Sequence, residues 1–252
     1  MAPLERRGSI THALDFWRQD SYSALGLPGD CPASNTYKYR DGTDDDNVSE
    51  SWAVLYHLAH MVTQVDVVHC RIYAGASEIH GKPIAPQVRK DVQRRMEEWA
   101  PTPRARHATF HAFCLLSRVM VRRDRSPSPS NLSSDISFYS ARDDHIPYRP
   151  WALYLATLVV WSYGFALEGP VQMPCQLLCD KTKVKDMVLY LNRMGGVKIP
   201  EDLNKTLDRN ACLGLMMIMR DKFGQTRWES LQEAGLSLTK CIEMLLPHAT
   251  SV

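Results

Sequence analysis

The most hydrophobic stretch of the chain lies in its second half, at residues 151–167. This segment carries no charged side chain, and its few polar residues are small. Pro150 at its start suits the first turn of a helix, and Gly169-Pro170 just after it ends one. The pattern predicts a helix that is apolar on every side, which is typical of a large core or of a membrane span. A span needs about 20 apolar residues and no polybasic flank is present, so we predict a core helix.

Along much of the remaining chain, apolar residues recur every three or four positions, which is the spacing of one helix face. Thr102-Pro103 and Pro86 signal helix starts, and Gly75 and Gly195-Gly196 signal helix ends. The pattern predicts helices at about 10–19, 48–74, 86–99, 102–121, 180–194, 211–223, 228–234 and 236–246, with a short one after Pro200. No alternating segment is long enough to build a sheet. The predicted fold class is therefore all-α, an irregular multi-helix bundle around the buried helix at 151–167.

Two of these helices carry cap signals at their N-termini. Asn47 followed by Glu50 has the spacing of a capping box, and the acidic run at 44–46 suits the positive end of the helix that follows. This placement explains the acidic run better than a metal site does. Asp180 is the predicted cap of the helix at 180–194.

Residues 123–137 differ in composition from the rest of the chain. They include the string SPSPSNLSSDIS, which is rich in serine and proline and too poor in apolar groups to fold by itself. We interpret this segment as a flexible insert that joins two halves of a single helical domain spanning residues 1–252.

Composition narrows the possible functions. The 252 residues are 44% hydrophobic and 23% charged, which is ordinary for a soluble globular protein. A formal net charge of +2 gives no reason to expect strong attraction to nucleic acid or acidic lipid. The seven scattered cysteines indicate buried free thiols in a reducing compartment rather than a disulfide framework. The first residues contain no continuous apolar segment of a secretory signal, so we expect a cytoplasmic or nuclear protein.

Histidines give the main candidate for metal or ligand chemistry. His57 and His60 are three residues apart, and His107 and His111 are four apart, so either pair can place two imidazoles on one helix face. Neither pair carries the glutamate of a metalloprotease motif, and hydrogen-bonded histidines at helix contacts are the alternative. The two pairs, together with His69 and Asp66, would converge if their helices pack together.

Other candidate sites are weaker, and no catalytic, cofactor-binding or metal-ligating residue is assigned. Cys175 and Cys179 lack a second Cys/His pair for a zinc finger. Ser162 is not in a Gly-x-Ser-x-Gly elbow, and Gly195-Gly196 is a helix stop rather than part of a phosphate loop. Asp143, Asp144 and His145 precede the central helix and fit an acid–base site no better than a solvated turn.

The densest basic cluster comprises Arg118, Arg122, Arg123 and Arg125, followed by Ser126-Pro127 and Ser128-Pro129. A solvated helix end and linker is the simplest interpretation. The sharper hypothesis is a phosphorylation switch at Ser126 and Ser128, because a phosphoserine beside arginines can order a loop.

Several uncommon strings occur together in one order. They are YHLAHM (56–61), VDVVHCRIYAGA (65–76), RRMEEWAPTPRARHATFHA (94–112), YSARDD (139–144), RPWALYLATLVVWSYGFALEGP (149–170) and RWESLQEAGLSLTKCIEML (227–245). Over about residues 17–246 the chain resembles the C-terminal part of the fungal-specific transcription factor domain, as found in zinc-finger regulators of filamentous fungi. The resemblance implies an all-helical regulatory region of a nuclear protein.

The zinc-binding DNA reader of that family and the first part of its regulatory domain have no counterpart in these residues. The resemblance therefore implies zinc only in that missing module, and it assigns no base-reading or phosphate-contacting role here. We expect either part of a longer regulator or a truncated paralogue that acts alone.

Three functions follow as hypotheses. The first is a regulatory, non-enzymatic region that binds proteins of the transcription machinery or a related regulator, reaches DNA only indirectly and has no membrane partner. The second is a metal- or small-molecule-binding protein, or an enzyme, that uses the histidine cluster. The third is a competitor that pairs with a full-length relative and withholds its activity.

Overall fold

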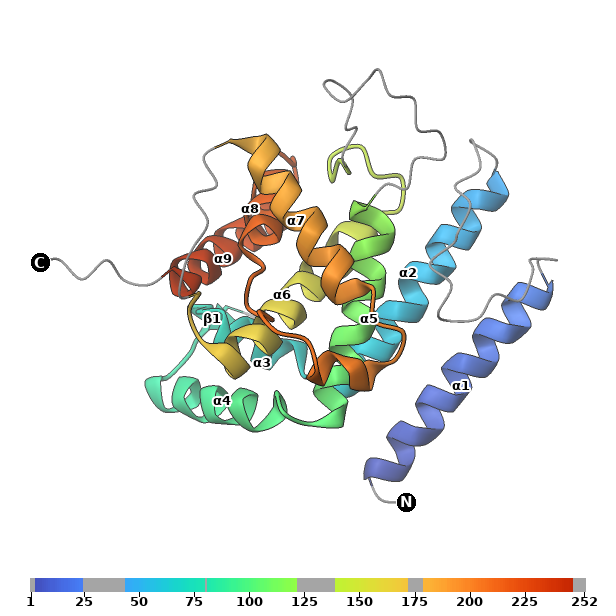
Figure 1. Ribbon diagram of the computed structural model, residues 1–252, viewed down its shortest axis with the longest axis horizontal. Helices are drawn as coiled ribbons and strands as arrows, with labels where there is room; N and C mark the ends of the chain where they lie inside the picture. The colour runs from blue at the N-terminus through green and yellow to red at the C-terminus, as the bar shows by residue number, and fades with distance from the viewer. Residues whose placement is uncertain (1–2, 25–43, 80, 122–138, 172–178, 247–252) are drawn as a thin grey trace, which may run out of the picture.

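The structure is a computed structural model that describes residues 3–24, 44–79, 81–121, 139–171 and 179–246. Nearly all regular structure in these ranges is helical (Figure 1). The helices are α1 (Pro3–Ala24), α2 (Asp44–Gln64), α3 (Val67–Tyr73), α4 (Pro86–Trp99), α5 (Pro103–Met120), α6 (Arg149–Glu168), α7 (Asp180–Gly195), the 3₁₀ helix η1 (Pro200–Asn204), α8 (Leu213–Gly224) and α9 (Glu229–Leu245). Strands β1 (Glu78–Ile79) and β2 (Lys82–Pro83) form one short antiparallel hairpin. The predicted all-α fold class is confirmed.

Helix α6 is the centre of the molecule. Thirteen of its 20 residues are buried, and it contacts α2, α3, α4, α5, α8 and α9. By length and composition α6 could cross a membrane, but 72% of its most apolar window is buried inside the structure. This burial by neighbouring helices is that of a core helix, as predicted for residues 151–167.

Two close contacts fix the C-terminal half of α6. Gly164 lies against the backbone of Arg209, where an added Cβ would clash with the carbonyl oxygen. Four residues later, Glu168 Oε1 accepts a hydrogen bond from Arg209 Nη1 at 3.0 Å. The other Glu168 carboxylate oxygen accepts from the backbone N–H of Asn210 at 3.2 Å. The loop before α8 is therefore held tightly against the end of the central helix.

The helix predicted at 48–74 is two helices. Asp66 interrupts it and caps α3, because its carboxylate accepts hydrogen bonds from the backbone N–H groups of Val68 and His69 at 2.9 and 3.3 Å. An aspartate with extended backbone geometry is a favourable N-cap. Apolar residues continue at helical spacing on both sides of Asp66, so the pattern alone did not reveal this cap in the sequence. Gly75, at a φ of +82°, ends α3 as expected for a glycine stop.

Both N-terminal helices start earlier than predicted. Helix α1 covers Pro3–Ala24 rather than 10–19. Helix α2 begins at Asp44, so Asn47 lies inside the helix and the predicted capping box at that position was wrong. In Figure 1, α1 lies at the edge of the molecule beside α2, and among the described helices α2 is its main contact.

At the start of α7 the cap is Cys179, not Asp180. The hydroxyl of Thr182 accepts from the backbone N–H of Cys179 at 3.2 Å and donates to its carbonyl oxygen at 2.7 Å. Asp180 is the first helical residue, and its carboxylate lies 2.9 Å from Lys183 Nζ. The end of α7 at Gly195 and Gly196 is as predicted. A Cβ at Gly195 would clash with the Ser117 hydroxyl, so this glycine lets α7 approach α5.

The last two predicted helices, 228–234 and 236–246, are one continuous helix, α9. Gly235 does not break it. An added Cβ there would lie 3.4 Å from the carbonyl oxygen of Arg220 on α8, so Gly235 lies where α9 packs closely on α8. Helix α8 buries Met216 and Met219 completely in this contact region.

Candidate functional site

The two histidine pairs face each other where α2 packs on α5. His57 and His60 lie on one face of α2, and His107 and His111 lie on one face of α5, because residues three and four apart are neighbours on a helix surface. Helix α5 starts at a defined residue, since the Thr102 hydroxyl accepts from the backbone N–H of Ala105 at 3.2 Å. The cap fixes the start of α5, and the packing of α5 on α2 places the rings of His107 and His111 against that of His60.

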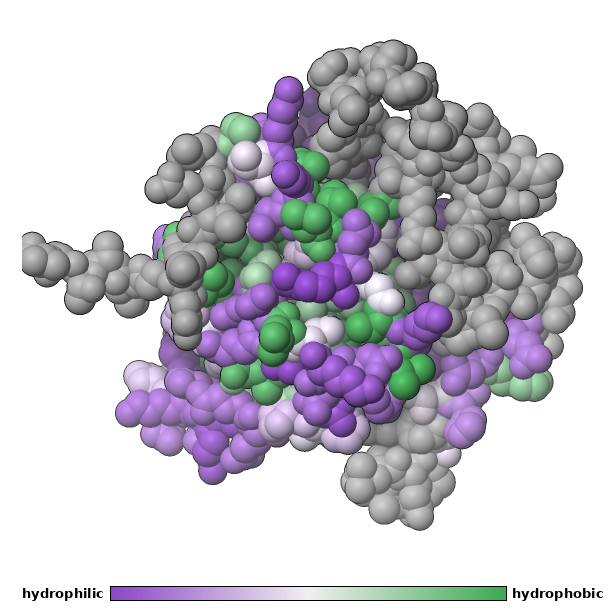
Figure 2. Space-filling model, in the orientation of Figure 1, coloured by the Kyte–Doolittle hydropathy of each residue, from purple (hydrophilic) through white to green (hydrophobic). Residues whose placement is uncertain are grey.

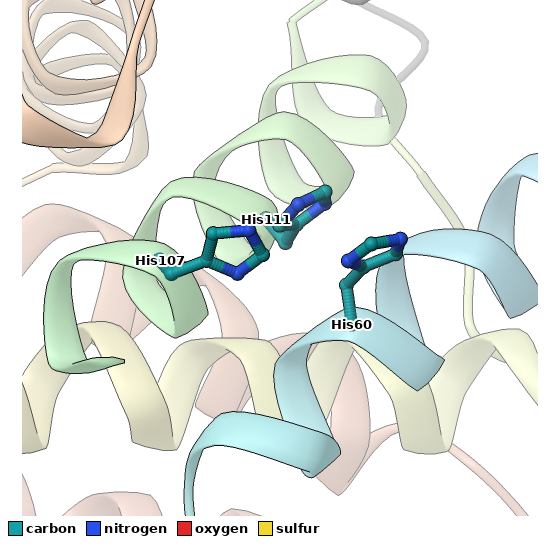
Figure 3. Close-up of side chains that lie close together, drawn as sticks. All are labelled: His60, His107 and His111. Carbon is teal, nitrogen blue, oxygen red and sulfur yellow. The ribbon is translucent and has the colours of Figure 1, made fainter. Parts of the chain in front are cut away.

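Three of the imidazoles converge. His60 from α2 and His107 and His111 from α5 point towards one another in Figure 3. One ring nitrogen from each can be chosen so that all three atoms lie within 4.8 Å of one another. The side chains of His60 and His111 are buried, with residue exposures of 2% and 6%. The convergence that the sequence left open is therefore present.

The fourth histidine, His57, contacts the cluster from one side. Its Nδ1 lies 3.0 Å from Nδ1 of His111, a hydrogen-bond distance in which one ring must donate and the other accept. If His111 donates, its Nε2 carries a free lone pair. His57 is thus placed to orient the His111 ring, and it is not one of the three histidines whose nitrogens converge.

Residues from α1 and α2 complete the surroundings of the cluster. Asp15 Oδ1 lies 3.4 Å from His60 Nε2 and accepts a hydrogen bond from the Tyr56 hydroxyl at 2.7 Å. The Arg18 guanidinium lies over the Tyr56 ring, 4.8 Å from its centroid. The site therefore has a carboxylate on the side of α1, with one cation nearby.

Burial lowers the pKa of all four imidazoles, because the low-dielectric interior disfavours their charged forms. Desolvation is the largest cause in each case and brings the pKa of His57 to about 3 and that of His60 to about 4. The pKa of His107 is lowered and that of His111 lies well below its usual value. The charge of Asp15 opposes this lowering at His60 and His107. The four rings are accordingly neutral near pH 7, and a neutral imidazole is the form that binds metals.

Several of these nitrogens have no hydrogen bond to the residues that the structure describes. Neither ring nitrogen of His60 makes one of good geometry, because its Nε2 approaches the Asp15 carboxylate only to 3.4 Å, and Nδ1 of His107 is also unpaired. A buried donor or acceptor without a partner costs about 1–3 kcal/mol. Such groups in a folded protein call for an explanation, and a bound ion or water is among the usual ones.

His69 and Asp66, which the sequence grouped with these histidines, belong to a different local structure. Asp66 caps α3, and His69 Nδ1 lies 3.6 Å from its carboxylate, one helical turn away. This pair is explained by helix capping and by a contact three residues apart on the same helix.

The other sequence candidates have structural roles. Asp144 accepts two hydrogen bonds of 2.7 Å from Arg149 and its side chain is 1% exposed, whereas His145 is exposed. Ser162 is buried in α6 beside the Cys70 thiol. Cys179 is exposed at the start of α7, and Cys175 lies outside the described residues.

Of the basic cluster, only Arg118 is described. Its guanidinium lies 2.8 Å from the Glu50 carboxylate, so it joins α5 to α2. Arg122, Arg123, Arg125 and the serines Ser126 and Ser128 lie outside the described residues, as does the whole segment 123–137, so the phosphorylation hypothesis stays a prediction.

Sequence reasoning missed Asp15 and Tyr56 as members of the site. Tyr56 directly precedes His57 and lies one helical turn before His60, so its place beside the cluster could have been inferred, whereas Asp15 has no histidine near it in the sequence except His12. Only the packing of α1 on α2, between residues some 40 positions apart in sequence, brings Asp15 to the cluster.

Comparisons with known proteins point to transcription regulation. The chain is 28% identical to the nicotinate catabolism cluster-specific transcription factor of Emericella nidulans over 183 residues, 69% of this chain and 19% of that protein. It is 29% identical to zinc finger protein zas1 of Schizosaccharomyces pombe over 120 residues, 45% of this chain and 11% of zas1. Zinc finger protein klf1 of the same yeast is 22% identical over 194 residues, 75% of this chain and 22% of klf1.

These similarities establish a partial, low-identity relationship to fungal transcription factors. The matched segments span only about a fifth or less of the length of those regulators. No family model matches the chain, and no solved structure matches it. The similar proteins are named as transcription factors and zinc finger proteins, not as enzymes.

Proposed function

We propose that this chain is a regulatory, protein-binding helical region of a fungal transcription factor that acts on RNA polymerase II transcription in the nucleus. The observation that carries the proposal is the similarity over 120 to 194 residues to three fungal regulators. The all-helical fold of the described residues and the structural roles of most candidate catalytic side chains agree with it.

Under this proposal DNA is reached indirectly, through a zinc-finger module outside these residues. The net charge of +2 supplies little attraction for phosphates. Several arginines of the described part are engaged in ion pairs with carboxylates, among them Arg118 with Glu50, Arg149 with Asp144 and Arg209 with Glu168. Such paired guanidiniums are poor candidates for phosphate contacts.

Protein partners would contact exposed side chains on the outer helices. The face shown in Figure 2 carries separate hydrophobic groups among hydrophilic ones. Exposed large hydrophobic residues include Leu189, Ile199 and Leu207 around α7 and η1, and Ile10, Phe16, Leu55 and Val62 on α1 and α2; Val88, Trp228 and Leu236 lie elsewhere. Partners of the transcription machinery or a related regulator fit a surface of this mixed kind.

The proposal is tested with a reporter assay. Residues 1–252 are fused to a heterologous DNA-binding domain, and reporter transcription is compared with that of the DNA-binding domain alone. We expect the fusion to raise or lower transcription. The effect is expected to disappear with Gly164→Ala, which disturbs the core, and to persist with the matched control Gly224→Ala, because a Cβ at Gly224 meets nothing within 4 Å.

A gel-shift assay addresses the DNA question separately. The isolated protein is expected to show no sequence-selective binding. Nanomolar, sequence-selective binding by the isolated chain would refute the proposal, as would a folded fusion that leaves transcription unchanged. Coprecipitation with a full-length relative would favour the variant in which the chain acts alone as a competitor.

A further inference from the structure

We propose that His60, His107 and His111, with Asp15 as the fourth ligand, form a binding site for a divalent transition-metal ion, zinc in the first place, between α1, α2 and α5. The zinc of a zinc-finger module would be a different ion at a different place. This site lies in the helical region itself.

The donor set suits such an ion. Three imidazole nitrogens and one carboxylate oxygen are ligands that zinc accepts in tetrahedral sites. Imidazole also suits copper and nickel, whereas calcium and magnesium prefer all-oxygen sites. Asp15 contributes a negative charge that partly offsets the ion and the nearby Arg18.

The distances are close to those of a bound site. Zinc bonds of about 2.0–2.1 Å in a tetrahedron place neighbouring ligand atoms about 3.4 Å apart. Asp15 Oδ1 and His60 Nε2 are already 3.4 Å apart. The three histidine ligand atoms lie within 4.8 Å of one another, so the most distant pair must close by at most about 1.4 Å.

Ring orientation shows which motion is needed. The His60 and His111 rings are stacked, with centroids 4.3 Å apart and planes 13° from parallel. Lone pairs in the planes of two stacked rings lie in parallel planes and do not point at one common ion. The His107 ring is turned by 36° from His60 and by 45° from His111. Coordination requires one stacked ring to turn about its Cβ–Cγ bond, a torsion with a broad energy minimum.

Two observations distinguish this cluster from histidines that merely fill a core. His60 is 98% buried, and neither of its nitrogens has a hydrogen bond within the described residues; Nδ1 of His107 is also unpaired. In addition, His111 Nδ1 lies 3.0 Å from His57 Nδ1, and in the tautomer in which His111 donates this hydrogen bond its Nε2 lone pair is left for the ion. A hydrogen bond of this kind from the second ring nitrogen commonly orients a metal-bound histidine.

Binding would tie the outermost helix to the bundle. Asp15 belongs to α1, whose main contact among the described helices is α2, and the other three ligands belong to α2 and α5. An ion at this point therefore crosslinks three helices, and its binding free energy adds to the stability of their packing.

The test uses the full chain stripped with a chelator and then titrated with Zn²⁺ by calorimetry and with Co²⁺ by visible absorption. We expect one tight site per chain, the strong visible bands of tetrahedral cobalt, and a rise in Tm on adding Zn²⁺. Binding without a Tm rise, or cobalt spectra of octahedral type only, would overturn the assignment.

Variants locate the site. His60→Gln and His107→Gln are each expected to weaken zinc binding more than about 100-fold, and His57→Gln by about 10–100-fold, the range for orienting partners of a ligand. His69→Gln is the matched control on α3 and is expected to leave affinity unchanged. The partly exposed position of His107 makes its variant the one least sensitive to folding, and circular dichroism checks its helicity.

The outcomes separate clearly. Loss of binding in folded His107→Gln with retention in His69→Gln supports the site. Unchanged affinity in His107→Gln, loss in His69→Gln, or absence of binding by the wild-type chain overturns it. None of these readouts depends on transcription, so the reporter assay can fail while the metal site stands, and the reverse.

Discussion

At the scale of single residues, the histidine cluster shows what sequence spacing can and cannot establish. The spacing of His57 and His60, and of His107 and His111, correctly predicted two pairs on helix faces. Whether the pairs meet depends on α2 packing against α5, which no local pattern encodes. His69 has the same local appearance as the others, yet it lies on a separate helix because Asp66 ends the run before it.

The neutral, buried histidines make stability depend on pH. The folded protein lowers the pKa of His57 to about 3 and of His60 to about 4 from an ordinary 6.5, so below pH 6.5 the unfolded chain binds more protons. Stability is thus complete above about pH 6.5 and falls as the pH drops towards these folded values, by about 1.4 kcal/mol per pH unit for each histidine. Denaturant unfolding of the chelator-treated protein between about pH 7.5 and pH 5 measures this loss.

The control for this experiment is His60→Phe, which keeps a ring of similar size and removes one titrating group. Its free energy of unfolding should fall less steeply with decreasing pH than that of the wild type. A free energy that stays constant from about pH 7.5 to pH 5 would contradict the neutral, buried state of the cluster.

Cysteine reactivity is a second property of single residues. Cys179 is exposed, and hydrogen bonds from the N-terminus of α7, chiefly the backbone N–H of Thr182, lower its pKa. Burial raises the pKa of Cys70, Cys114 and Cys212 to about 12. Because the thiolate is the reactive form, iodoacetamide at neutral pH should label Cys179 well before those three thiols.

Peptide mapping by mass spectrometry measures the labelling of each cysteine separately. In denaturant all four thiols should react at similar rates, which is the internal control. Equal labelling of Cys179 and Cys212 in the folded protein would show that the exposure and packing described here are wrong.

At the scale of elements, helix type was easier to predict than helix ends. The 3.6-residue pattern identified α4, α5, α7 and α8 within a few residues, because each has one apolar face and a clear start or stop. The errors in the predicted helix bounds lie where a single residue has a role that the spacing of apolar residues does not reveal. Asp66 starts a new helix within a segment that was predicted to be one helix, and Gly235 allows close packing on α8 where the prediction placed a break.

Gly164 gives a test of close packing between elements. An Ala side chain there would overlap the carbonyl oxygen of Arg209, and the backbone cannot move aside without disturbing the Glu168–Arg209 contacts. We expect Gly164→Ala to lower the free energy of unfolding by about 2 kcal/mol or more. Chemical denaturation followed by circular dichroism measures the change.

Gly224→Ala is the matched control for this substitution. It adds the same methyl group at the last residue of α8, where nothing lies within 4 Å, and alanine is the better helix former. It should be neutral or slightly stabilising. A similar loss in both variants would mean that the contact of Gly164 with Arg209 does not account for the effect.

At the scale of the whole molecule, the sequence predicted the centre better than the periphery. A helix of this length without charged residues can bury its apolar side chains only if other helices pack on all its sides. Residues 151–167 therefore indicated a central helix before any contact was known. The position of α1 could not be predicted, because the spacing of its apolar residues indicates a helix but not the element on which that helix packs. Its link to the rest depends on a few contacts, such as the Tyr56–Asp15 hydrogen bond and the Trp17–Trp52 ring pair at 4.4 Å.

Because α6 is central and α1 lies at the edge, deleting α1 and truncating a side chain of α6 should have unequal effects on stability. Deleting residues 1–43 takes away α1, whose main contact among the described helices is α2, so the remaining helices should stay folded with a modestly lower Tm. By contrast, Trp161→Ala changes a fully buried side chain of α6 and should cost about 3–5 kcal/mol. Thermal unfolding by circular dichroism compares the two. The deletion also removes Asp15, so it should weaken zinc binding without abolishing it, since three histidine ligands remain. If the deletion unfolds the chain as completely as the loss of Trp161, α1 is part of the core and the division between centre and edge fails.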